Sequence, residues 1–318
     1  MMHQGRALFW EVDPFMIPKS NEYQDPRSPD CINLLKSGML DADRVTTVSK
    51  TYAEEIRSPD FSFYLDETIW QVKDKTLGIL NGIDELYWNP NDKNFIPYPF
   101  DKLDPIEKIH ESKKNNKKFL EKKLNTSFGN KPLFCVISRL DHQKGPYLIS
   151  QAARDIAEDG GYCLILGKTV TYEIEELFSH LSQELSQSHH FLFLNIFDEN
   201  LSKLIFASSD YILIPSIFEP CGLTQMIGMR FGTIPIARKT GGLADTVIDI
   251  HDQHSPEESK TGFSFDEKSY PAFLKKIKEA FILDRDQRKK DHLIKKIMQK
   301  DFSWKVPASK YMQLYSSL

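Results

Sequence analysis

The sequence predicts an α/β protein built on a doubly wound parallel sheet, and three observations support this prediction. Strand-like and helix-like segments alternate from residue 132 onward, which is typical of parallel strands joined by right-handed crossovers. The strand-like segments are short apolar runs such as LFCVI, as expected for buried strands. The helix-like segments are amphipathic; Leu148, Ala152 and Ile156, for example, share one side of a helix.

The alternating region predicts six strands and four helices. Strands are expected at 133–140, 162–167, 190–197, 211–216, 233–238 and 262–266, and helices at 147–159, 174–185, 199–209 and 223–232. Sheets of this kind bind ligands at the carboxyl ends of their strands. Each loop that follows a strand is therefore a candidate site.

The first third of the chain carries shorter signals. Residues 1–40 show little regular periodicity and contain four prolines. The segment 42–56 predicts a short strand and then a helix capped by Ser49, and 77–80 predicts a short strand that ends at an Asn-Gly turn. Residues 89–108 contain four prolines and are interpreted as a linker.

Two basic stretches, 107–123 and 285–300, are interpreted as helices whose charged faces are solvated. Nucleic-acid binding is the alternative for the first stretch, and a partner site is the alternative for the second. The net charge of −4 argues against nucleic acid as the main partner, because duplex-binding proteins usually carry a basic excess.

Length and composition narrow the class of protein further. A chain of 318 residues favours two lobes over one core. No apolar run reaches the roughly 18 residues of a membrane span, and the N-terminus lacks the pattern of a signal peptide. Cys31, Cys135, Cys163 and Cys221 are dispersed without a CxxC motif, so we expect no zinc and a reducing, cytoplasmic location.

Two of the loops after strands carry candidate ligand-binding side chains. The loop SRLDHQKG places Arg139 and Lys144 at a strand end and Gly145 before the next helix, and two cations with helix amides suit a diphosphate. An ordinary surface role for both cations stays open. Phe197 follows the third strand, where it either packs or stacks on a base.

Two further loops follow the fourth and fifth strands. The first contains Glu219, Cys221, Gly222 and Thr224, which puts a carboxylate and a small-residue turn between a strand and a helix. The second contains a Gly-Gly pair that permits close approach of the backbone to a ligand. Neither GxGxxG nor GxxxxGK[ST] is present, so an NAD-type or a P-loop site finds no support.

These loops resemble the motifs of one enzyme family. The stretch SIFEPCGLTQMIGMRFGTIPIARKTGGLADTV at 216–247 resembles the signature block of bacterial glycogen synthases and plastid starch synthases. Four further family motifs are resembled, in chain order, by TTVSKTYAEEI, LNGIDELYWNP, SRLDHQKG and the C-terminal FSWKVPASKYMQLYSSL. Together the motifs cover nearly all of the chain from residue 37 onward.

The resemblance implies the GT-B fold, in which two Rossmann-like lobes face each other across a cleft. It implies a remnant of the first lobe at 1–85, a complete nucleotide-sugar-binding lobe at 86–298, and a C-terminal helix at 299–318 that crosses back to the first lobe. The implied reaction transfers glucose from ADP-glucose to the non-reducing end of an α-1,4-glucan with retention, without a metal or a cofactor. The choice of ADP-glucose over UDP-glucose rests on the resemblance.

The resemblance also implies roles for individual residues. Arg139 and Lys144 would neutralise the leaving diphosphate, and Glu219 would bind the glucose hydroxyls. The other implied nucleotide-sugar contacts are Phe197 at the adenine, Cys221, Gly222, Leu223 and Thr224 around the distal phosphate, and Thr240, Gly241 and Gly242 along the sugar and phosphate side. Ile227 stands where many retaining relatives have a second glutamate, which we interpret as a subfamily feature.

The sequence departs from the family pattern at its start. A K-[TV]-GGL loop of the first lobe is missing, and MMHQG resembles only the tail of the family's HNxx[YH]QG segment, so His3 is not the family's catalytic histidine. We therefore expect a truncated chain that is inactive alone. The alternatives are a non-catalytic remnant that binds nucleotide or glucan, and one half of an enzyme whose first lobe comes from a separate chain. A sucrose-type or lipopolysaccharide transferase is disfavoured by EPCGL in place of EPFGL.

Overall fold

The computed structural model describes residues 4–12 and 21–318, which form two compact units. One unit contains residues up to Asn81 together with Lys305–Leu318, and the other contains Gly82–Trp304. His3 lies outside the described residues. Within the described residues, no helix is both long and apolar enough to cross a membrane.

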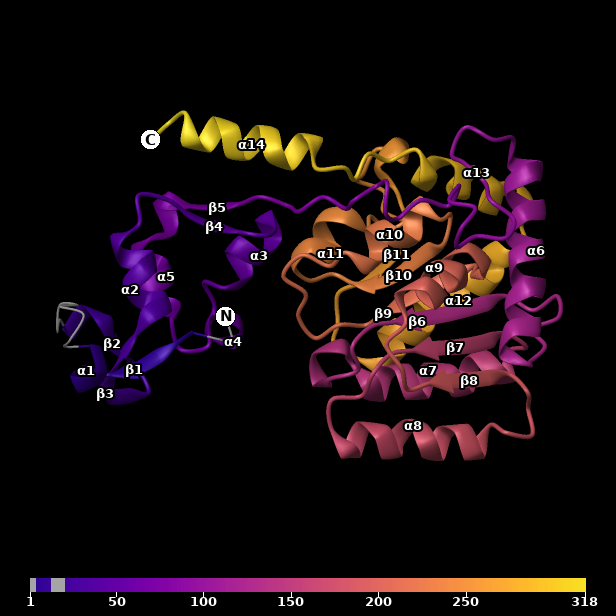
Figure 1. Cartoon of the computed structure of the whole chain (residues 1–318), viewed down its shortest axis with the longest axis horizontal. Coiled ribbons are helices and arrows are strands. Elements are labelled where there is room, and N and C mark those ends of the chain that lie inside the picture. Colours follow the sequence, from indigo (N-terminus) through magenta and orange to yellow (C-terminus); the bar gives the residue numbers. More distant parts are fainter. Residues whose placement is uncertain (1–3, 13–20) are drawn as a thin grey trace. The chain divides into compact units, whose positions relative to one another are not determined.

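The larger unit is built on a six-stranded sheet in which every neighbouring pair of strands is parallel. The strand order is β11-β10-β9-β6-β7-β8, and helices cover both faces (Figure 1). The strands are β6 (Leu133–Ile137), β7 (Tyr162–Leu166), β8 (Phe191–Leu194), β9 (Tyr211–Ile214), β10 (Ile234–Arg238) and β11 (Phe263–Phe265). All six predicted strands are confirmed, each somewhat shorter than the apolar run suggested.

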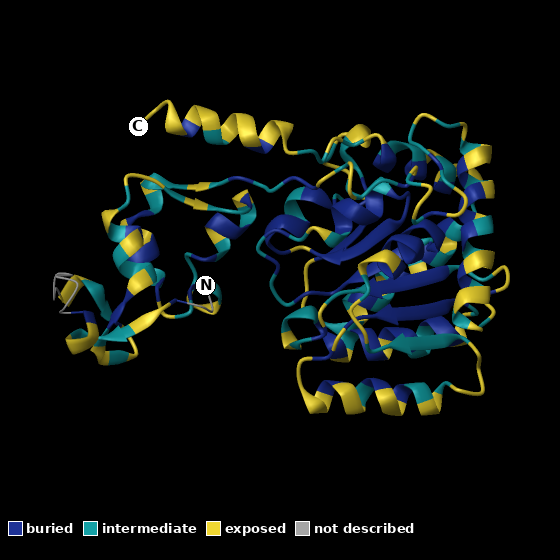
Figure 2. Ribbon diagram, viewed as in Figure 1, coloured by how far each residue is buried: buried dark blue, intermediate teal, exposed yellow. Residues whose placement is uncertain are grey.

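The helices of this unit are α6 (Ile106–Leu124), α7 (Pro146–Glu158), α8 (Tyr172–Glu184), α9 (Glu199–Ser208), α10 (Thr224–Arg230), α11 (Gly241–Thr246), α12 (Tyr270–Asp284) and α13 (Gln287–Met298). Short 3-10 turns lie at His142–Lys144 and Glu257–Ser259. The four predicted crossover helices are confirmed as α7, α8, α9 and α10. The central strands β7, β9 and β10 are buried along their whole length, whereas the edge strand β8 is half-buried (Figure 2).

The smaller unit contains two small sheets. An antiparallel sheet orders β1 (Arg6–Leu8), β3 (Ser28–Asn33) and β2 (Gln24–Asp25), and β4 (Val45–Thr47) pairs in parallel with β5 (Thr76–Gly78). Its helices are α1 (Phe9–Val12), α2 (Leu34–Asp41), α3 (Lys50–Glu55), α4 (Pro59–Ser62), α5 (Asp66–Gln71) and α14 (Lys305–Tyr315), with 3-10 turns at Asn21–Tyr23 and Lys73–Lys75. Met39, Tyr52, Ile56, Leu65, Ile69 and Val72 form its apolar cluster.

Local signals account for part of this smaller unit. The predicted strand and helix at 42–56 are β4 and α3, and the Ser49 hydroxyl caps α3 by accepting from the Tyr52 amide at 2.8 Å. Asn33 caps α2 in the same way through the Lys36 amide. The sequence did not predict α2 or β3 because neither has a strong apolar period, and the paired strands of the sheet come from separate segments.

The prediction of a solvated charged face on α6 is wrong for its inward positions. Lys113 is 7% exposed, and its ammonium donates to the carbonyl oxygens of Phe231 at 2.9 Å and Phe206 at 3.3 Å. Because α6 packs on α9, one stripe of the lysine-rich helix must be buried. A lysine fits there because its ammonium satisfies carbonyl groups near the ends of neighbouring helices. Lys290, in the second basic stretch, is also buried.

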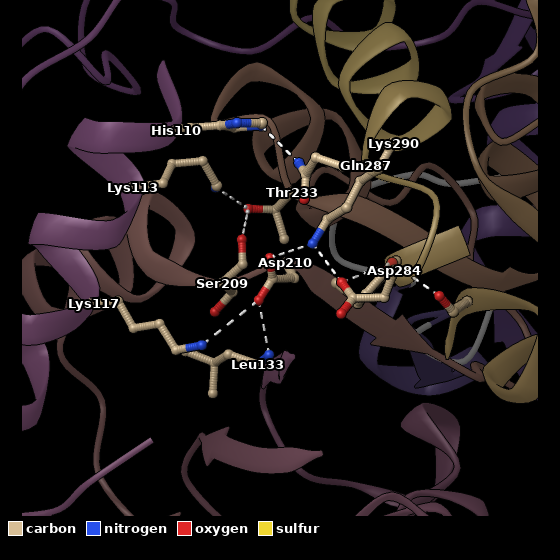
Figure 3. A network of polar contacts seen from close by, with 12 residues as sticks. His110, Lys113, Lys117, Leu133, Ser209, Asp210, Thr233, Asp284, Gln287 and Lys290 are labelled. Carbon is tan, nitrogen blue, oxygen red and sulfur yellow. Dashed lines mark hydrogen bonds and ion pairs between the residues drawn. The ribbon is translucent and has the colours of Figure 1, made fainter. Parts of the chain in front are cut away.

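Asp210 joins Lys290 and Lys117 to the amino ends of two central strands (Figure 3). Its carboxylate accepts from the Leu133 amide at 2.9 Å and from the Lys290 ammonium at 2.7 Å, and the Lys117 ammonium lies 3.9 Å away. Lys290 also binds Asp284 at 2.5 Å. Burial by itself would raise the pKa of Asp210, but the charges of Lys290 and Lys117 and the amide hydrogen bond outweigh burial and lower it.

We predict that Asp210→Asn destabilises the chain by about 3 kcal/mol at pH 7, because the substitution leaves the buried Lys290 with less negative charge around it. Urea unfolding of both proteins measures the difference. The lowered pKa of Asp210 means that its stabilising contribution is complete above about pH 5, beyond the ordinary carboxyl range. The difference between the two proteins should therefore shrink as the pH falls below about 4.

Glu184→Gln is the matched control, because it removes the half-exposed ion pair between Glu184 and Arg154. Its cost should stay below about 1 kcal/mol. Equal costs for the two substitutions would contradict a structural role for the Asp210 network.

Candidate functional site

The loops after β6 and β9 meet through one ion pair. These two strands are neighbours in the sheet, so their carboxyl ends lie side by side. The Lys144 ammonium binds the Glu219 carboxylate at 2.5 Å, and the Ser216 hydroxyl donates to the same carboxylate oxygen at 3.0 Å. The side chains of Lys144 and Glu219 are only 21% and 10% exposed. The structure thus brings together two of the three residues predicted to be catalytic.

Gln143 and Gly145 hold the same two loops together through the backbone. The carbonyl of Gln143 accepts from the Ile217 amide at 2.7 Å, and its side-chain amide donates to the Phe218 carbonyl at 3.0 Å. Gly145 has a φ of +71°, and a Cβ at this position would lie 2.5 Å from the Pro215 carbonyl oxygen. Only glycine combines this backbone conformation with such close approach.

The Gly-Gly pair packs against the Glu219 loop. The Gly242 amide donates to the Glu219 carbonyl at 3.0 Å. A Cβ on Gly241 would lie 2.0 Å from the Glu219 carbonyl oxygen, and one on Gly242 would lie 1.8 Å from that of Cys221. The sequence predicted close approach of a ligand here; the close approach that the structure shows is to the backbone of the chain itself. Thr240, just before α11, is fully buried.

Two polar residues that the sequence analysis gave no role also shape the site. Arg238, at the end of β10, is buried and donates to the Ser216 carbonyl at 2.7 Å and to the Ile217 carbonyl. Gln225, in α10, is fully buried and donates to the Gly222 carbonyl at 2.7 Å. A charged or amide side chain inside an apolar strand or helix was the available signal, because such groups are buried only when they are hydrogen-bonded.

A cavity of about 20 Å³ lies beside the ion pair, which is enough space for one water molecule. Lys144, Glu219, Gly222, Thr224 and Gln225 contribute to its lining. Leu223, which precedes α10, is 42% exposed, and Cys221 is buried. The first amides of α10 lack partners within their own helix, as at any helix start.

Two predicted site residues have other surroundings than this ion pair. Arg139 forms an ion pair with Asp141 at 2.7 Å, and its side chain is 67% exposed. Phe197 follows the edge strand β8 and is 83% exposed. Within the described residues, no hydrogen bond or ion pair joins either side chain to Glu219 or Lys144. Chemically, the cluster offers a carboxylate for hydroxyl groups, an adjacent cation and a set of helix-start amides for an anion.

The fold of this chain is also found in known structures. Two solved structures at low sequence identity share the fold: a glycosyltransferase from Rickettsia africae at 21% identity and a TM-score of 0.62, and a sucrose-phosphate synthase from Thermosynechococcus elongatus at 22% and 0.61. The first covers 93% of this chain and 68% of its own, and the second 89% and 60%. The expected GT-B fold is confirmed.

The family follows from the sequence match. Residues 117–299 match the family described as glycosyl transferases group 1, so the chain belongs to that family. Residues 1–71 match the starch synthase catalytic domain.

The curated relatives agree with the resemblance to glycogen and starch synthases. A probable starch synthase 4 from Arabidopsis thaliana is 39% identical over 99% of this chain and 30% of its own length. A glycogen synthase from Protochlamydia amoebophila is 35% identical over 100% and 66%. The catalytic domain of starch synthase IV from Arabidopsis thaliana, solved with ADP and acarbose, has a TM-score of 0.91 at 39% identity and covers 99% of this chain and 65% of its own. The chain thus spans less than two thirds of these relatives.

We predict that Gly242→Ala destabilises the larger unit by about 2 kcal/mol, because its methyl group must displace the Cys221 carbonyl. Thermal unfolding measures the effect. Gly38→Ala in α2 is the control: a Cβ there meets nothing within 4 Å, and alanine favours a helix by up to about 1 kcal/mol. A Gly242→Ala protein as stable as the unmodified chain would contradict the close packing of the two loops.

Proposed function

We propose that this chain supplies the donor-binding half of a retaining glucosyltransferase of the glycogen and starch synthase type. The proposed reaction transfers glucose from ADP-glucose to the non-reducing end of an α-1,4-glucan, in the cytoplasm, without metal or cofactor. The observation that carries the proposal is the partly buried pair of Lys144 and Glu219 beside the start of α10. The ligands of the starch synthase IV structure, ADP and acarbose, agree with it.

In this proposal, Glu219 accepts hydrogen bonds from glucose hydroxyls. Its carboxylate is fixed by Lys144 and Ser216 and still has lone pairs available. A preorganised acceptor of this kind orients the sugar at little entropic cost. Gly241 and Gly242 pack on the backbone at 219–221, and with Thr240 they would line the sugar and phosphate side of the site.

The leaving diphosphate needs positive charge as its bond to glucose breaks. Lys144 supplies it from its fixed position against Glu219. Arg139 supplies a second charge by leaving its exposed pair with Asp141. The amides at Leu223 and Thr224 would contact the distal phosphate, with Cys221 and Gly222 shaping the turn before them. Phe197, exposed after β8, is available to stack on the adenine.

The division into a first-lobe segment at 1–85, a donor lobe at 86–298 and a returning helix at 299–318 stays part of this proposal. So does the α-1,4-glucan acceptor, which the first lobe would contact. A separate chain that supplies the rest of the first lobe is the alternative source of a complete cleft.

Calorimetry with ADP, ADP-glucose and UDP-glucose tests the donor site. We expect ADP to bind, and Arg139→Gln to weaken it about tenfold through loss of one charge-assisted hydrogen bond. Arg154→Gln, which removes a distant exposed arginine paired with Glu184, should leave ADP affinity unchanged. Absence of ADP binding at millimolar concentration, or equal effects of the two substitutions, would refute the site.

Glu219→Gln separates sugar binding from phosphate binding. We expect it to weaken ADP-glucose relative to ADP by about tenfold, because the sugar loses a charged acceptor while Lys144 stays available to the phosphates. Incorporation of labelled glucose into glycogen then tests catalysis. Donor binding without any transfer, even with an added first lobe, would favour a non-catalytic nucleotide-binding protein.

A further inference from the structure

A second polar cavity, of about 310 Å³, lies at the opposite end of the strands, where their amino ends are. Asp210 and Pro132, which precede β9 and β6, contribute to its lining, so it lies at the amino ends of these strands. The loops of the candidate donor site follow the carboxyl ends. Helices α6 and α13 form its walls (Figure 3). The two sites therefore share the sheet but no lining residue.

The lining of this cavity carries an excess of positive charge. Its lysines are Lys113, Lys114, Lys117, Lys131 and Lys290. Its carboxylates are Asp210 and Asp284. When every lysine is protonated, five ammonium groups and two carboxylates leave an excess of three positive charges. Another wall residue, His110, has its own partner in Asp291 at 2.8 Å.

The two carboxylates are already used by two of the lysines. Lys290 contacts both Asp210 and Asp284, and Lys117 lies 3.9 Å from Asp210. Lys114 is exposed and Lys131 half-exposed, and the ion pairs within residues 4–12 and 21–318 give neither of them a carboxylate partner. The ammonium groups of Lys114 and Lys131 therefore belong to a cavity whose two carboxylates, Asp210 and Asp284, are already paired with other lysines.

Lys113 adds a third cation without a carboxylate bond. Its ammonium donates to the Phe231 and Phe206 carbonyls and lies 3.4 Å from the Thr233 hydroxyl. Burial lowers the pKa of Lys113 to about 7, which the charge of Asp210 opposes and that of Lys290 reinforces. A bound anion would favour the charged form of this lysine.

We propose that this cavity binds a small anion of the phosphate class with two or more negative charges, held between α6 and α13. Lys114 and Lys131 bind it at the mouth, and Lys117 and Lys113 contribute charge from the wall. A multivalent phosphate suits the site because several lysines line a space of limited size. This inference is independent of the proposed transferase reaction, because it uses none of the donor-site residues.

Calorimetry at low salt with inorganic pyrophosphate and with fructose 1,6-bisphosphate tests the proposal. The Arg139→Gln variant serves as the starting protein, so that binding at the candidate donor loops is weakened. We expect Lys114→Gln to weaken binding about tenfold, and Lys114→Gln with Lys117→Gln to weaken it further. Tighter binding of the bisphosphate would identify a phosphorylated metabolite as the source of the anion, and tighter binding of pyrophosphate an inorganic one.

Lys118→Gln is the matched control, because Lys118 is exposed on the same helix but lines a different cavity. It should leave the affinity unchanged. Equal weakening by Lys118→Gln and Lys114→Gln, or no binding by the starting protein, would overturn the proposal. Lys114→Gln removes an exposed side chain, so it tests the site even if the double variant fails to fold.

Discussion

The parallel pairing of β9 between β6 and β10 is the constraint on which the rest of the larger unit depends. It places the loops that follow β6, β9 and β10 side by side at the carboxyl ends of the strands, although the first loop lies far from the other two along the chain. Lys144 from the first loop and Glu219 from the second then meet, while Gly242 from the third binds the backbone beneath them. The pairing itself depends on strands so apolar that only the interior of a sheet accommodates them.

The two ends of the strands in this sheet carry different arrangements of charge. At the carboxyl ends of the strands, one partly buried ion pair lies beside a helix start and a cavity of about 20 Å³. At the amino edge, Asp210 ties the Leu133 amide to Lys290 and so anchors α13 to the beginning of β6. A buried ion pair of this sort adds little to the net free energy of unfolding. Removing one of its partners, however, is strongly destabilising, because the other charge stays buried and unpaired. A consequence of the ion pair is a fixed arrangement of the surrounding lysines.

The sequence predicted features that depend on interactions between residues close in the chain, and it missed those that depend on residues far apart in the chain. Strands and crossover helices were predicted because each is encoded by a local period in its own residues. The α6 lysines were misinterpreted because the burial of Lys113 depends on α9 and on carbonyls more than 90 residues away, at Phe206 and Phe231. Arg238 went unassigned for the same reason: its partners, the Ser216 and Ile217 carbonyls, lie in the loop after another strand. Gln225 bonds the nearby Gly222 carbonyl, and its burial in α10 depends on tertiary packing.

The sequence alone determined the fold class, the order of strands and helices along the chain, and the family, since five motifs in series are specific. It also placed Lys144, Glu219 and the Gly-Gly pair in loops after strands. Only the tertiary structure decided that Lys144 is paired with Glu219, that Arg139 is paired with Asp141, that Phe197 is exposed, and that both glycines make contacts within the chain. The physical reason is that ion pairs and close backbone approach depend on distances across the sheet, which strand order sets and residue type does not.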